Sequence, residues 1–598
     1  MKENGFIRVA AAVPTVKVGA PTRNADEICR HISEAETNDV SVIVFPELSV
    51  TGCTCADLFR QKTLIQTSEK AVGTIAEFSY GKNISIVAGV PVSFKGNLYN
   101  CAVVIRNGKL QGIVPKMEIS AAQSRWFTSG SVLHAVETLN YAGQSAEMYP
   151  GLSFKHDGVT FAVFESASGA QIILHPASDA EYLGSDAIVR KRLSDLSRSE
   201  ANIHVHASAG CGESTQDNVY AGAAYIWEKG VLKAKNERFS MTPSITTYDT
   251  GGNTAYITDY QEYIHNDKIE RNPFLPEGKE EEMCSDALSI QVAGLAHRLS
   301  HINCKTAIIG ISGGLDSTLA LLVAALAFDV TGRPRKDIIG VTMPGFGTTA
   351  RTKGNAWDLM EALGITCKEI SVVPACIQHF KDIEHDINVH DATYENSQAR
   401  ERTQILMDMA NKEGGIVIGT GDMSELALGW ATYNGDHMSM YGVNAGVPKT
   451  MVKAIVRWAA ENRFAEKTAS GRSVKDILFD ILDTPISPEL LPATEDGQIN
   501  QVTEDLVGPY ELHDFFLYHF VGKGAVPGEI LRMAEEVFDG IYDHQTIEKW
   551  LKTFIRRFFS QQFKRSCMPD GPQVCEVTLS PRGGWMMPSD AWSVDFML

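Results

Sequence analysis

The first half of the chain alternates apolar runs with amphipathic stretches. Runs rich in β-branched residues and bounded by turn residues occupy 41–50, 83–92, 99–116, 159–165, 170–178 and 202–210, and each predicts β-structure. Between them, residues 24–39 and 187–201 carry helical periodicity. Because the β-runs are apolar almost throughout, we expect sheets that are covered on both faces. The pattern predicts an α/β domain over residues 1–265.

This alternation stops after Tyr263. Residues 264–286 are charged, contain two prolines and lack periodicity, which is typical of a connecting segment. We therefore place a linker at 266–285 and a second α/β domain at 286–598. That domain opens with a helical pattern at 287–303 and a buried strand that ends at Ile311.

Composition narrows the classes of function. The 598 residues carry a net charge of −19 with no compensating basic stripe, which argues against a nucleic-acid partner but not against a bound nucleotide. No run of 18 apolar residues occurs, so we expect no membrane-spanning helix and no membrane partner. The 11 cysteines include no CxxC pair, which favours reduced thiols and a cytoplasmic location.

The strongest local signal is "TAIIGISGGLDSTLALLVAALAF" at 306–328. A strand, a Ser-Gly-Gly turn and an apolar helix follow one another. Glycines let the backbone approach an anion, and the first N–H groups of a helix are unpaired donors. Asp316 is placed to hold Mg²⁺ between phosphate oxygens. The Walker A pattern is absent, and the plainer alternative is a Gly-rich turn with a capped helix.

Further blocks narrow the chemistry. The loop resembles the pyrophosphate-binding motif of N-type ATP pyrophosphatases, and "YENSQARERTQ", "GIVIGTGDMSELALGW", "VNAGVPKT", "SQQFKR" and "LSPRGGW" resemble NAD⁺ synthetase. The resemblance implies a Rossmann-like parallel α/β synthetase domain of the adenine nucleotide alpha-hydrolase type. It also implies ATP-dependent amidation of deamido-NAD⁺ (nicotinic acid adenine dinucleotide) through an adenylylated intermediate, with release of AMP and pyrophosphate.

The resemblance assigns site residues by position. It implies ATP binding at Ser312, Gly313, Gly314, Leu315, Asp316, Ser317, Thr420 and Gly421, deamido-NAD⁺ binding at Asn396, Glu425, Trp430, Lys449 and Lys564, and Mg²⁺ at Asp316 and Glu425. Arg400 and Arg402 are candidates to neutralise phosphates. Without the resemblance, Asn396 fits a helix cap, Trp430 a core position and the two arginines a solvated helix face. The tail departs from the family, because "RGGWMMPSD" replaces the usual "RGDWRMPSD" and puts Gly584 and Met586 in place of an acid and a base.

The first half resembles the nitrilase-like glutaminase domain, an αββα sandwich, that is fused to NAD⁺ synthetase. "VIVFPELSVTG" carries Glu47 at the family's general base, and "GIVPK" carries Lys116 at its oxyanion-stabilising lysine. The cysteine nucleophile is missing, because "VTFAVFE" runs almost directly into "SASGAQIILHPAS". Amide hydrolysis through a thioester needs a thiolate. The loop "KMEISAAQSRWF" is also shorter than in relatives, and Cys53 replaces their tyrosine.

Three hypotheses remain open from the sequence. The chain is an NAD⁺ synthetase that uses free ammonia, with a degenerate glutaminase domain in which Glu47 and Lys116 are remnants. Alternatively, it hydrolyses glutamine with an unrecognised nucleophile such as Cys53 or Ser166. In the third, it is a non-catalytic nucleotide-binding or assembly protein. The resemblance further implies a homo-oligomer, commonly an octamer, with ATP, deamido-NAD⁺ and ammonia as ligands and glutamine as an open question.

Overall fold

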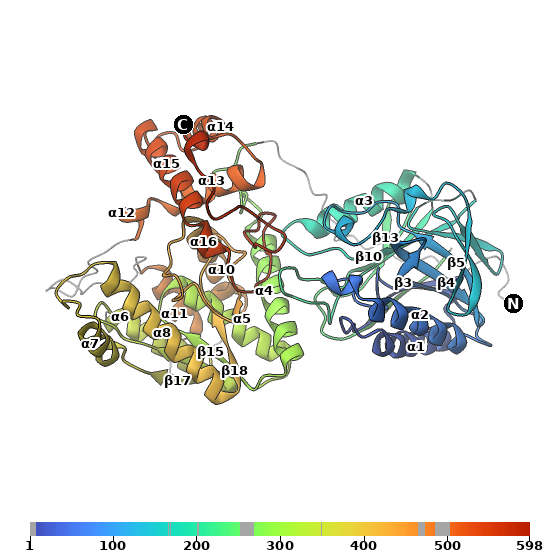
Figure 1. Ribbon diagram of the computed structural model, residues 1–598, viewed down its shortest axis with the longest axis horizontal. Helices are drawn as coiled ribbons and strands as arrows, with labels where there is room; N and C mark the ends of the chain where they lie inside the picture. The colour runs from blue at the N-terminus through green and yellow to red at the C-terminus, as the bar shows by residue number, and fades with distance from the viewer. Residues whose placement is uncertain are drawn as a thin grey trace. The chain divides into compact units, whose positions relative to one another are not determined.

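The computed structural model describes residues 7–165, 167, 169–199, 202–250, 268–348, 350–464, 473–484 and 503–598. The chain divides into unit 1, Met1–Ser214 with Val219–His265, and unit 2, Thr215–Asn218 with Asn266–Leu598 (Figure 1). The short segment 215–218 therefore belongs to unit 2, where the Gly571 N–H donates to Gln216 O at 2.9 Å. No helix among the described residues combines the length and apolar character needed to cross a membrane.

Unit 1 is built from two mixed sheets. One has the order β14-β1-β2-β3-β4-β5-β7-β6 and the other β13-β12-β11-β10-β9-β8. The elements are β1 Arg8–Val13, α1 Pro21–Thr37, β2 Val42–Val44, α2 Lys62–Phe78, β3 Ser85–Phe94, β4 Asn97–Arg106, β5 Lys109–Pro115, β6 Glu137–Tyr141, β7 Gln144–Met148, β8 Ser153–His156, β9 Val159–Val163, β10 Ile172–Ala177, α3 Ser185–Ser199, β11 Ile203–Ser208, β12 Ala224–Glu228, β13 Val231–Lys235 and β14 Ser244–Asp249.

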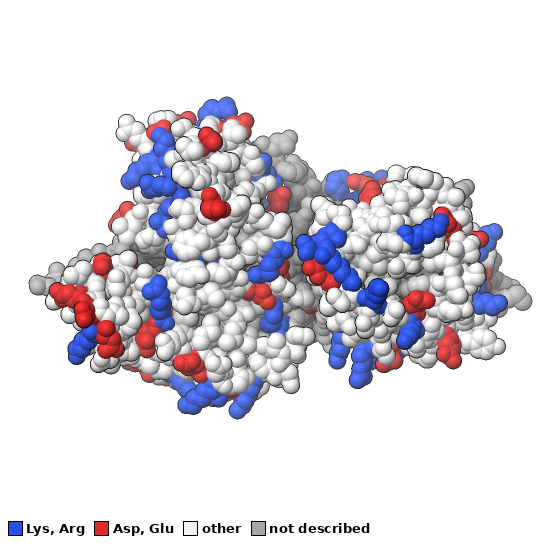
Figure 2. All heavy atoms as spheres, in the orientation of Figure 1, with Lys and Arg blue, Asp and Glu red and all other residues white. Residues whose placement is uncertain are grey.

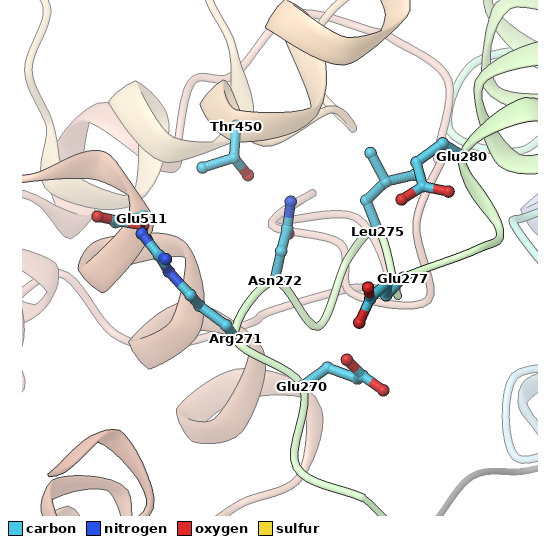
Figure 3. A pocket seen from close by; sticks show the side chains of 8 residues that line it. All are labelled: Glu270, Arg271, Asn272, Leu275, Glu277, Glu280, Thr450 and Glu511. Carbon is cyan, nitrogen blue, oxygen red and sulfur yellow. Dashed lines mark hydrogen bonds and ion pairs between the residues drawn. The ribbon is translucent and has the colours of Figure 1, made fainter. Parts of the chain in front are cut away.

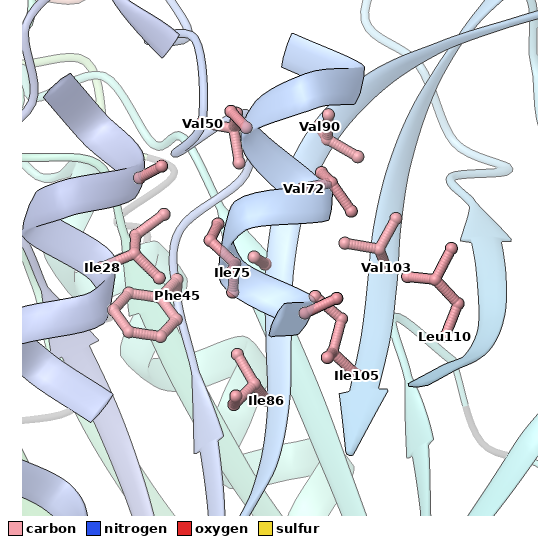
Figure 4. Packing of buried hydrophobic residues seen from close by; sticks show 14 of the residues in the cluster. Ile28, Phe45, Val50, Val72, Ile75, Ile86, Val90, Val103, Ile105 and Leu110 are labelled. Atoms are coloured by element: carbon pink, nitrogen blue, oxygen red, sulfur yellow. The ribbon is translucent and has the colours of Figure 1, made fainter. Parts of the chain in front are cut away.

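The sheets alternate the direction of their side chains, so each sheet contributes to two apolar layers. Val9, Val44 and Val87 of the first sheet pack with Phe161 and Val205 of the second in a core between the sheets. The opposite face of the first sheet packs against α1 and α2, as Figure 4 shows for residues that include Ile28, Phe45, Val72, Ile75 and Ile86. Helix α3 covers the second sheet through Leu193, which packs with Tyr225 and Trp227. This is the predicted αββα sandwich.

One predicted β-run proves to be two strands. Residues 99–116 lie in the antiparallel hairpin of β4 and β5, which turns at Asn107 and Gly108 with φ angles of 48° and 77°. An Asn-Gly pair adopts these positive φ angles at low cost and is a strong hairpin signal. The hairpin places Lys116 directly after β5, where its N–H donates to Asn100 O of β4 at 2.9 Å.

Unit 2 contains one parallel sheet with the order β17-β16-β15-β18-β19. Its elements are α4 Glu280–Ile302, β15 Thr306–Gly310, α5 Leu315–Val330, β16 Ile338–Thr342, α6 Ala350–Ala362, β17 Thr366–Glu369, α7 Val373–Asp382, α8 Ala392–Glu413, β18 Gly415–Gly419, α9 Met423–Leu428, β19 Tyr441–Gly442, α10 Lys449–Asn462, α11 Val474–Leu482, α12 Thr503–Val507, α13 Tyr510–Leu517, α14 Pro527–Val537, α15 His544–Ser560 and α16 Gln562–Arg565. The Rossmann-like expectation is confirmed.

The segment expected to be a linker ends earlier than predicted. Helix α4 begins at Glu280 rather than in the region of residue 287, so residues 280–285 form its first turns. Three glutamates occupy the first turn, where a negative side chain interacts favourably with the positive end of the helix dipole. The charge that made this stretch look like a linker therefore also suits a helix start.

Acidic and basic side chains are interspersed on the face of the molecule in Figure 2. No long single-sign stripe crosses that face.

Candidate active site

The topology of unit 2 creates a switch point between β15 and β18. These strands are parallel neighbours, with Ala307 opposite Ile416 and Ile308 opposite Val417. The chain leaves β15 towards β16 and β17 and then returns to β18 on the other side. In an open parallel sheet the loops diverge at such a point and leave a crevice beyond the carboxyl ends of the strands, where ligands bind.

The loop after β15 has the geometry of an anion cradle. Gly313 has a φ of +88°, and a Cβ there would lie 2.3 Å from Thr352 O, so only glycine fits. Ser312 Oγ accepts from the Gly314 N–H at 3.2 Å, and Ser317 Oγ donates to Gly314 O at 3.1 Å. Helix α5 starts at Leu315, and its first N–H groups lie at the loop. The predicted residues from 312 to 317 thus form one compact turn suited to phosphate oxygens.

Lys449 joins the two loops of the switch point. Its Nζ lies 2.7 Å from Asp316 Oδ2, 2.9 Å from Glu425 Oε1 and 2.6 Å from Asp422 Oδ2. The lysine side chain is 3% exposed. Three carboxyl groups around one buried ammonium offer more oxygen acceptors than the lysine can satisfy, and a further cation or the N–H groups of a ligand would satisfy the rest.

The sequence analysis did not identify two residues of this cluster, Asp422 and Asn444. Asp422 is fully buried and also caps α9, because its Oδ1 accepts from the Glu425 N–H at 2.9 Å. Asn444 donates from Nδ2 to both Asp316 O and Thr420 O at 2.9 Å, and so links the loops after β15 and β18. An acid at a helix N-cap in "GTGDMSE" was the only available signal for Asp422; nothing in the sequence marked Asn444.

The cluster perturbs the acid–base properties of its members. Burial raises the pKa of Glu425 to about 7, although Lys449 opposes this. Burial likewise raises the pKa of Asp422 well above its usual range. Burial alone would lower the pKa of Lys449, but the attraction of the three carboxylates outweighs it and the pKa lies well above the ordinary value. Lys449 is therefore a permanent cation near neutral pH, while Glu425 exchanges its proton there.

The carboxylates suit a hard divalent cation. Asp316, Asp422 and Glu425 each offer an oxygen, and these oxygens lie within 4.8 Å of one another. Asp316 Oδ1 is buried and has no hydrogen-bond partner among the described residues. Carboxylate oxygens at such spacing are the ligands that Mg²⁺ prefers. The set fits the ion that the family resemblance implies and adds Asp422 to the two predicted ligands.

Tyr510 and Asp514 of α13 pack against Lys449 and against the start of α10. The Tyr510 ring centroid lies 5.2 Å from Lys449 Nζ, and its buried hydroxyl has no hydrogen-bond partner within the described ranges. Asp514 accepts from Ser424 Oγ and from the Thr450 N–H and Oγ. These contacts fix the start of α10, and therefore the direction from which Lys449 enters the cluster.

The residues predicted to meet deamido-NAD⁺ fall into two groups. Glu425 and Lys449 belong to the carboxylate cluster, whereas Asn396, Trp430 and Lys564 surround the segment after α9. Lys564 Nζ donates to Gly429 O at 2.8 Å and to Ala431 O at 2.6 Å, on either side of Trp430. Asn396 Oδ1 accepts from Thr432 Oγ1 at 2.6 Å. Asn396 and Lys564 therefore hold the short segment that contains Trp430. The Trp430 ring is partly buried, and its centroid lies 5.3 Å from the Arg557 guanidinium carbon.

Arg400 and Arg402 do not act as a pair. Both lie on α8 but two residues apart, so they point in different directions. Arg400 Nε donates to Tyr433 O at 3.3 Å, and Arg402 Nε donates to Met343 O at 3.2 Å. Arg402 thus lies near the carboxyl end of β16, whereas Arg400 lies beside the Trp430 segment.

A separate pocket of about 330 Å³ lies next to α10 and α13 in unit 2 (Figure 3). Arg271 Nε donates to Glu511 Oε2 at 3.0 Å within it, so the one arginine of the lining is already paired. Thr450 follows Lys449 in sequence and forms part of the wall. The lining residues are Glu270, Arg271, Asn272, Leu275, Glu277, Glu280, Thr450 and Glu511.

Unit 1 contains the second lysine–carboxylate cluster. Lys116 Nζ lies 2.6 Å from Glu47 Oε2, so these two residues form an ion pair. Glu47 Oε1 accepts from Asn100 Nδ2 and from Gln123 Nε2, each at 2.5 Å. The Glu47 side chain is 0% exposed. Three donors therefore surround this carboxylate, and neither Asn100 nor Gln123 was marked by the sequence.

Comparison with known proteins agrees with both halves of this architecture. A carbon-nitrogen hydrolase family model matches residues 8–256, and an NAD synthase family model matches residues 288–553. The chain is 34% identical to the glutamine-dependent NAD(+) synthetase of Mycobacterium leprae, over 98% of this chain and 96% of the relative. The corresponding protein of Mycobacterium tuberculosis (strain H37Rv) is also 34% identical, with the same shares covered.

A solved structure shares the fold. The glutamine-dependent NAD(+) synthetase from Cytophaga hutchinsonii aligns over 98% of both chains with a TM-score of 0.81 at 20% identity. The match therefore extends through both units. Since two curated relatives match nearly the whole length at more than 30% identity and both family models apply, the chain belongs to the two-domain glutamine-dependent NAD(+) synthetase family.

Proposed function

We propose that this NAD⁺ synthetase amidates deamido-NAD⁺ with free ammonia, and that its unit 1 no longer hydrolyses glutamine. The observation that carries the proposal is the state of Glu47. A general base must lie within hydrogen-bond reach of the proton it takes. Both Glu47 oxygens instead accept from the chain's own Lys116, Asn100 and Gln123.

The cysteines of unit 1 support the same conclusion. A reactive cysteine has a lowered pKa and a cationic neighbour. Burial raises the pKa of every cysteine in this unit, to about 11 for Cys29 and Cys211, to about 12 for Cys55, and well above the ordinary value for Cys53 and Cys101. None has the properties of a thiolate nucleophile.

Cys53 was the leading substitute nucleophile. Burial is the main reason for its raised pKa, and the nearby Glu213 and Glu47 carboxylates raise it further. Its hydrogen-bond neighbours are Glu213 and Tyr220 rather than Glu47. A protonated thiol facing two carboxylates is a poor nucleophile. The other candidate, Ser166, lies outside the described residues.

The synthetase chemistry follows from the charges in unit 2. In the first step an oxygen of the deamido-NAD⁺ carboxylate attacks the α-phosphorus of ATP, and pyrophosphate leaves. In the second step neutral ammonia attacks the acyl carbon, AMP leaves with the bonding pair of the acyl–oxygen bond, and the new amide nitrogen loses one proton to solvent. We assign phosphate binding to the backbone N–H groups at 312–317 and charge neutralisation to Lys449.

A bound Mg²⁺ would be held by Asp316, Asp422 and Glu425 and would neutralise phosphate charge. Around it, the protein supplies orientation. Asn444 holds the Asp316 and Thr420 loops together, and Asp514 fixes the start of α10. We assign Trp430, Asn396 and Lys564 to the dinucleotide, since they define one surface near Glu425, and Arg402 to a phosphate near β16.

The test is NAD⁺ formation by the purified protein with ATP, Mg²⁺ and deamido-NAD⁺. Ammonium chloride is compared with glutamine that has been freed of ammonia. We expect turnover with ammonium, a rate that rises with pH because neutral NH₃ is the nucleophile, and no turnover with glutamine. Comparable rates with both donors would refute the ammonia-only assignment, and absence of turnover with either would refute the activity itself.

A glutamine-hydrolysing enzyme is the second candidate, because the relatives named above are glutamine-dependent. If glutamine does support NAD⁺ formation, Cys53→Ala identifies the nucleophile. Loss of the glutamine-driven rate alone, with the ammonium-driven rate retained, would assign the thiol. Cys211→Ala is the control, since Cys211 is another free cysteine of unit 1 and its thiol donates to Met241 O rather than facing Glu47.

A further inference from the structure

The group that closes the Glu47 site is itself a primary carboxamide. Gln123 Nε2 donates to Glu47 Oε1 at 2.5 Å, while Lys116 Nζ holds the other oxygen at 2.6 Å. Any substrate processed by this pair would place its reacting group within hydrogen-bond reach of the same atoms. Gln123 therefore occupies the place of a substrate, and its side chain ends in the same functional group as free glutamine.

The loop that carries Gln123 is held in place from both sides. Trp126 Nε1 donates to Asp57 Oδ1 at 2.8 Å, and the Arg125 guanidinium pairs with the same carboxylate. The Trp126 and Phe127 N–H groups both donate to Gln123 O at 2.9 Å. Phe127 packs edge-on against Phe59 with ring centroids 4.8 Å apart. Gln123 thus enters the site from an anchored turn rather than from a free surface loop.

The remaining polar atoms of the site complement an amide. Asn100 is 1% exposed, and its Oδ1 has no hydrogen-bond partner among the described residues. Glu47 Oε1 is a buried acceptor that already takes one N–H of the Gln123 amide, which suits the NH₂ group of a primary carboxamide. Lys116 provides N–H donors for a carbonyl oxygen. A carboxylate ligand would lack the N–H donors and would meet the negative charge of Glu47.

We propose that unit 1 retains a primary-carboxamide site and that the chain fills it with its own Gln123 side chain, as a tethered substitute for a substrate. The inference rests on the proposed loss of glutamine hydrolysis and extends it. A tethered group acts at an effective concentration of about millimolar or above, so free amides compete poorly. Removal of the Gln123 side chain opens the site to small primary amides and to glutamine.

The experiment measures binding of propionamide to the full-length protein by saturation-transfer NMR. Gln123→Ala is expected to bind propionamide at least tenfold more tightly than the unaltered protein, and to discriminate against propionate, its carboxylate counterpart. Ser124→Ala is the matched control, because it alters the neighbouring residue and keeps Gln123. It is expected to behave like the unaltered protein.

One further variant and two folding controls exclude a non-specific effect of the substitution. The double variant Gln123→Ala with Glu47→Gln removes the anionic acceptor and should lose the gain in propionamide binding. Circular dichroism and the ammonium-driven rate establish that each variant is folded. Equal propionamide binding by Gln123→Ala and Ser124→Ala, or equal binding of propionate and propionamide by Gln123→Ala, would overturn the inference.

This outcome is separable from that of the proposed function. Glutamine-driven NAD⁺ formation by the unaltered protein would refute the ammonia-only assignment, whatever Gln123→Ala binds. Conversely, a folded Gln123→Ala variant that binds no amide refutes the tethered-substitute inference while the ammonium-driven activity stands.

Discussion

Each unit pairs a lysine ammonium with carboxylate oxygens, but the two clusters differ in which groups contact the remaining carboxylate oxygens. The Lys449 side chain is 3% exposed, whereas that of Lys116 is 25% exposed. In unit 1, Asn100 and Gln123 complete the hydrogen bonding of Glu47. In unit 2, Lys449 is shared among three acids, and Asp316 Oδ1 keeps no partner among the described residues. The first cluster is closed by its own chain, whereas the second retains capacity for a ligand.

The comparison teaches that an ion pair is weak evidence for catalysis on its own. The pair of Lys116 and Glu47 has as short a distance, 2.6 Å, as any contact of Lys449. The two clusters differ in the number of hydrogen-bond donors for each carboxyl group. In unit 1 three donors surround one carboxylate, whereas in unit 2 one lysine is shared among three carboxyl groups. The second arrangement is the one that a charged ligand would complete.

The largest expected difference comes from making the same Glu→Gln substitution in each cluster: a large loss of rate is expected in unit 2 and almost none in unit 1. Glu425→Gln removes a charge from the unsatisfied cluster and should lower ammonium-driven NAD⁺ formation by about 10²–10³-fold, as for loss of one electrostatic contact in an active site. Glu47→Gln, its isosteric counterpart in unit 1, should leave that rate within about twofold. Steady-state assays with ammonium chloride measure both; similar losses in both variants would contradict the contrast.

A smaller effect is expected from Asp422→Asn. Asparagine keeps the oxygen that caps α9 but replaces one of the three carboxyl groups around Lys449 with a neutral amide that cannot ionise. The apparent Mg²⁺ affinity should fall by about 10–100-fold, as measured by metal titration of the rate. Asp329→Asn, at an exposed ion pair with Arg335, serves as the control and should leave the titration unchanged. An unaltered affinity in Asp422→Asn would exclude this acid from the metal site.

The third prediction concerns pH. Burial raises the pKa of Glu425 to about 7, so below pH 7 a proton competes with the cation for its carboxylate. The affinity for Mg²⁺ should therefore fall by up to about tenfold per pH unit below 7 and level off above it. Calorimetric titration with Mg²⁺ at several pH values tests this without interference from the pH dependence of ammonia. Glu425→Gln should flatten the profile, and a steep profile in that variant would implicate another group.

The smallest effect is expected away from both clusters. A Cβ at Gly584 would lie 2.7 Å from Thr578 Cγ2 and 2.9 Å from Thr578 O. The surrounding atoms therefore leave no room for a side chain at the position where the family resemblance implies an acid. Gly584→Asp should lower stability by about 1 kcal/mol, at the lower end of the cost of overpacking, and should not restore glutamine use. Chemical denaturation measures the first effect; Met586→Arg, at an exposed side chain, should cost nothing measurable.

Much of this protein was predictable from local patterns. The strand, Ser-Gly-Gly turn and helix predicted at 306–328 follow from the sequence, because a buried apolar run, two glycines and an apolar helical run follow one another directly. Both halves were assigned to their fold classes from alternating apolar runs, since such runs need covered sheets. Glu47 and Lys116 were identified by resemblance. In the structure these two residues form an ion pair, so the resemblance had matched positions that lie together in the fold.

Only the tertiary structure decided how these groups are completed. Gln123 reaches Glu47 across 76 residues of sequence, and Asn444 reaches Asp316 across 128. No periodicity or spacing encodes such contacts, because they depend on how separate elements pack and on which way an anchored loop turns. The sequence alone determined that each unit carries a lysine and acids of a known chemistry. Packing places the amides of Asn100 and Gln123 against Glu47, whereas it leaves Asp316 Oδ1 without a partner among the described residues. A buried oxygen without a partner costs free energy, so either the chain itself or a ligand must satisfy it.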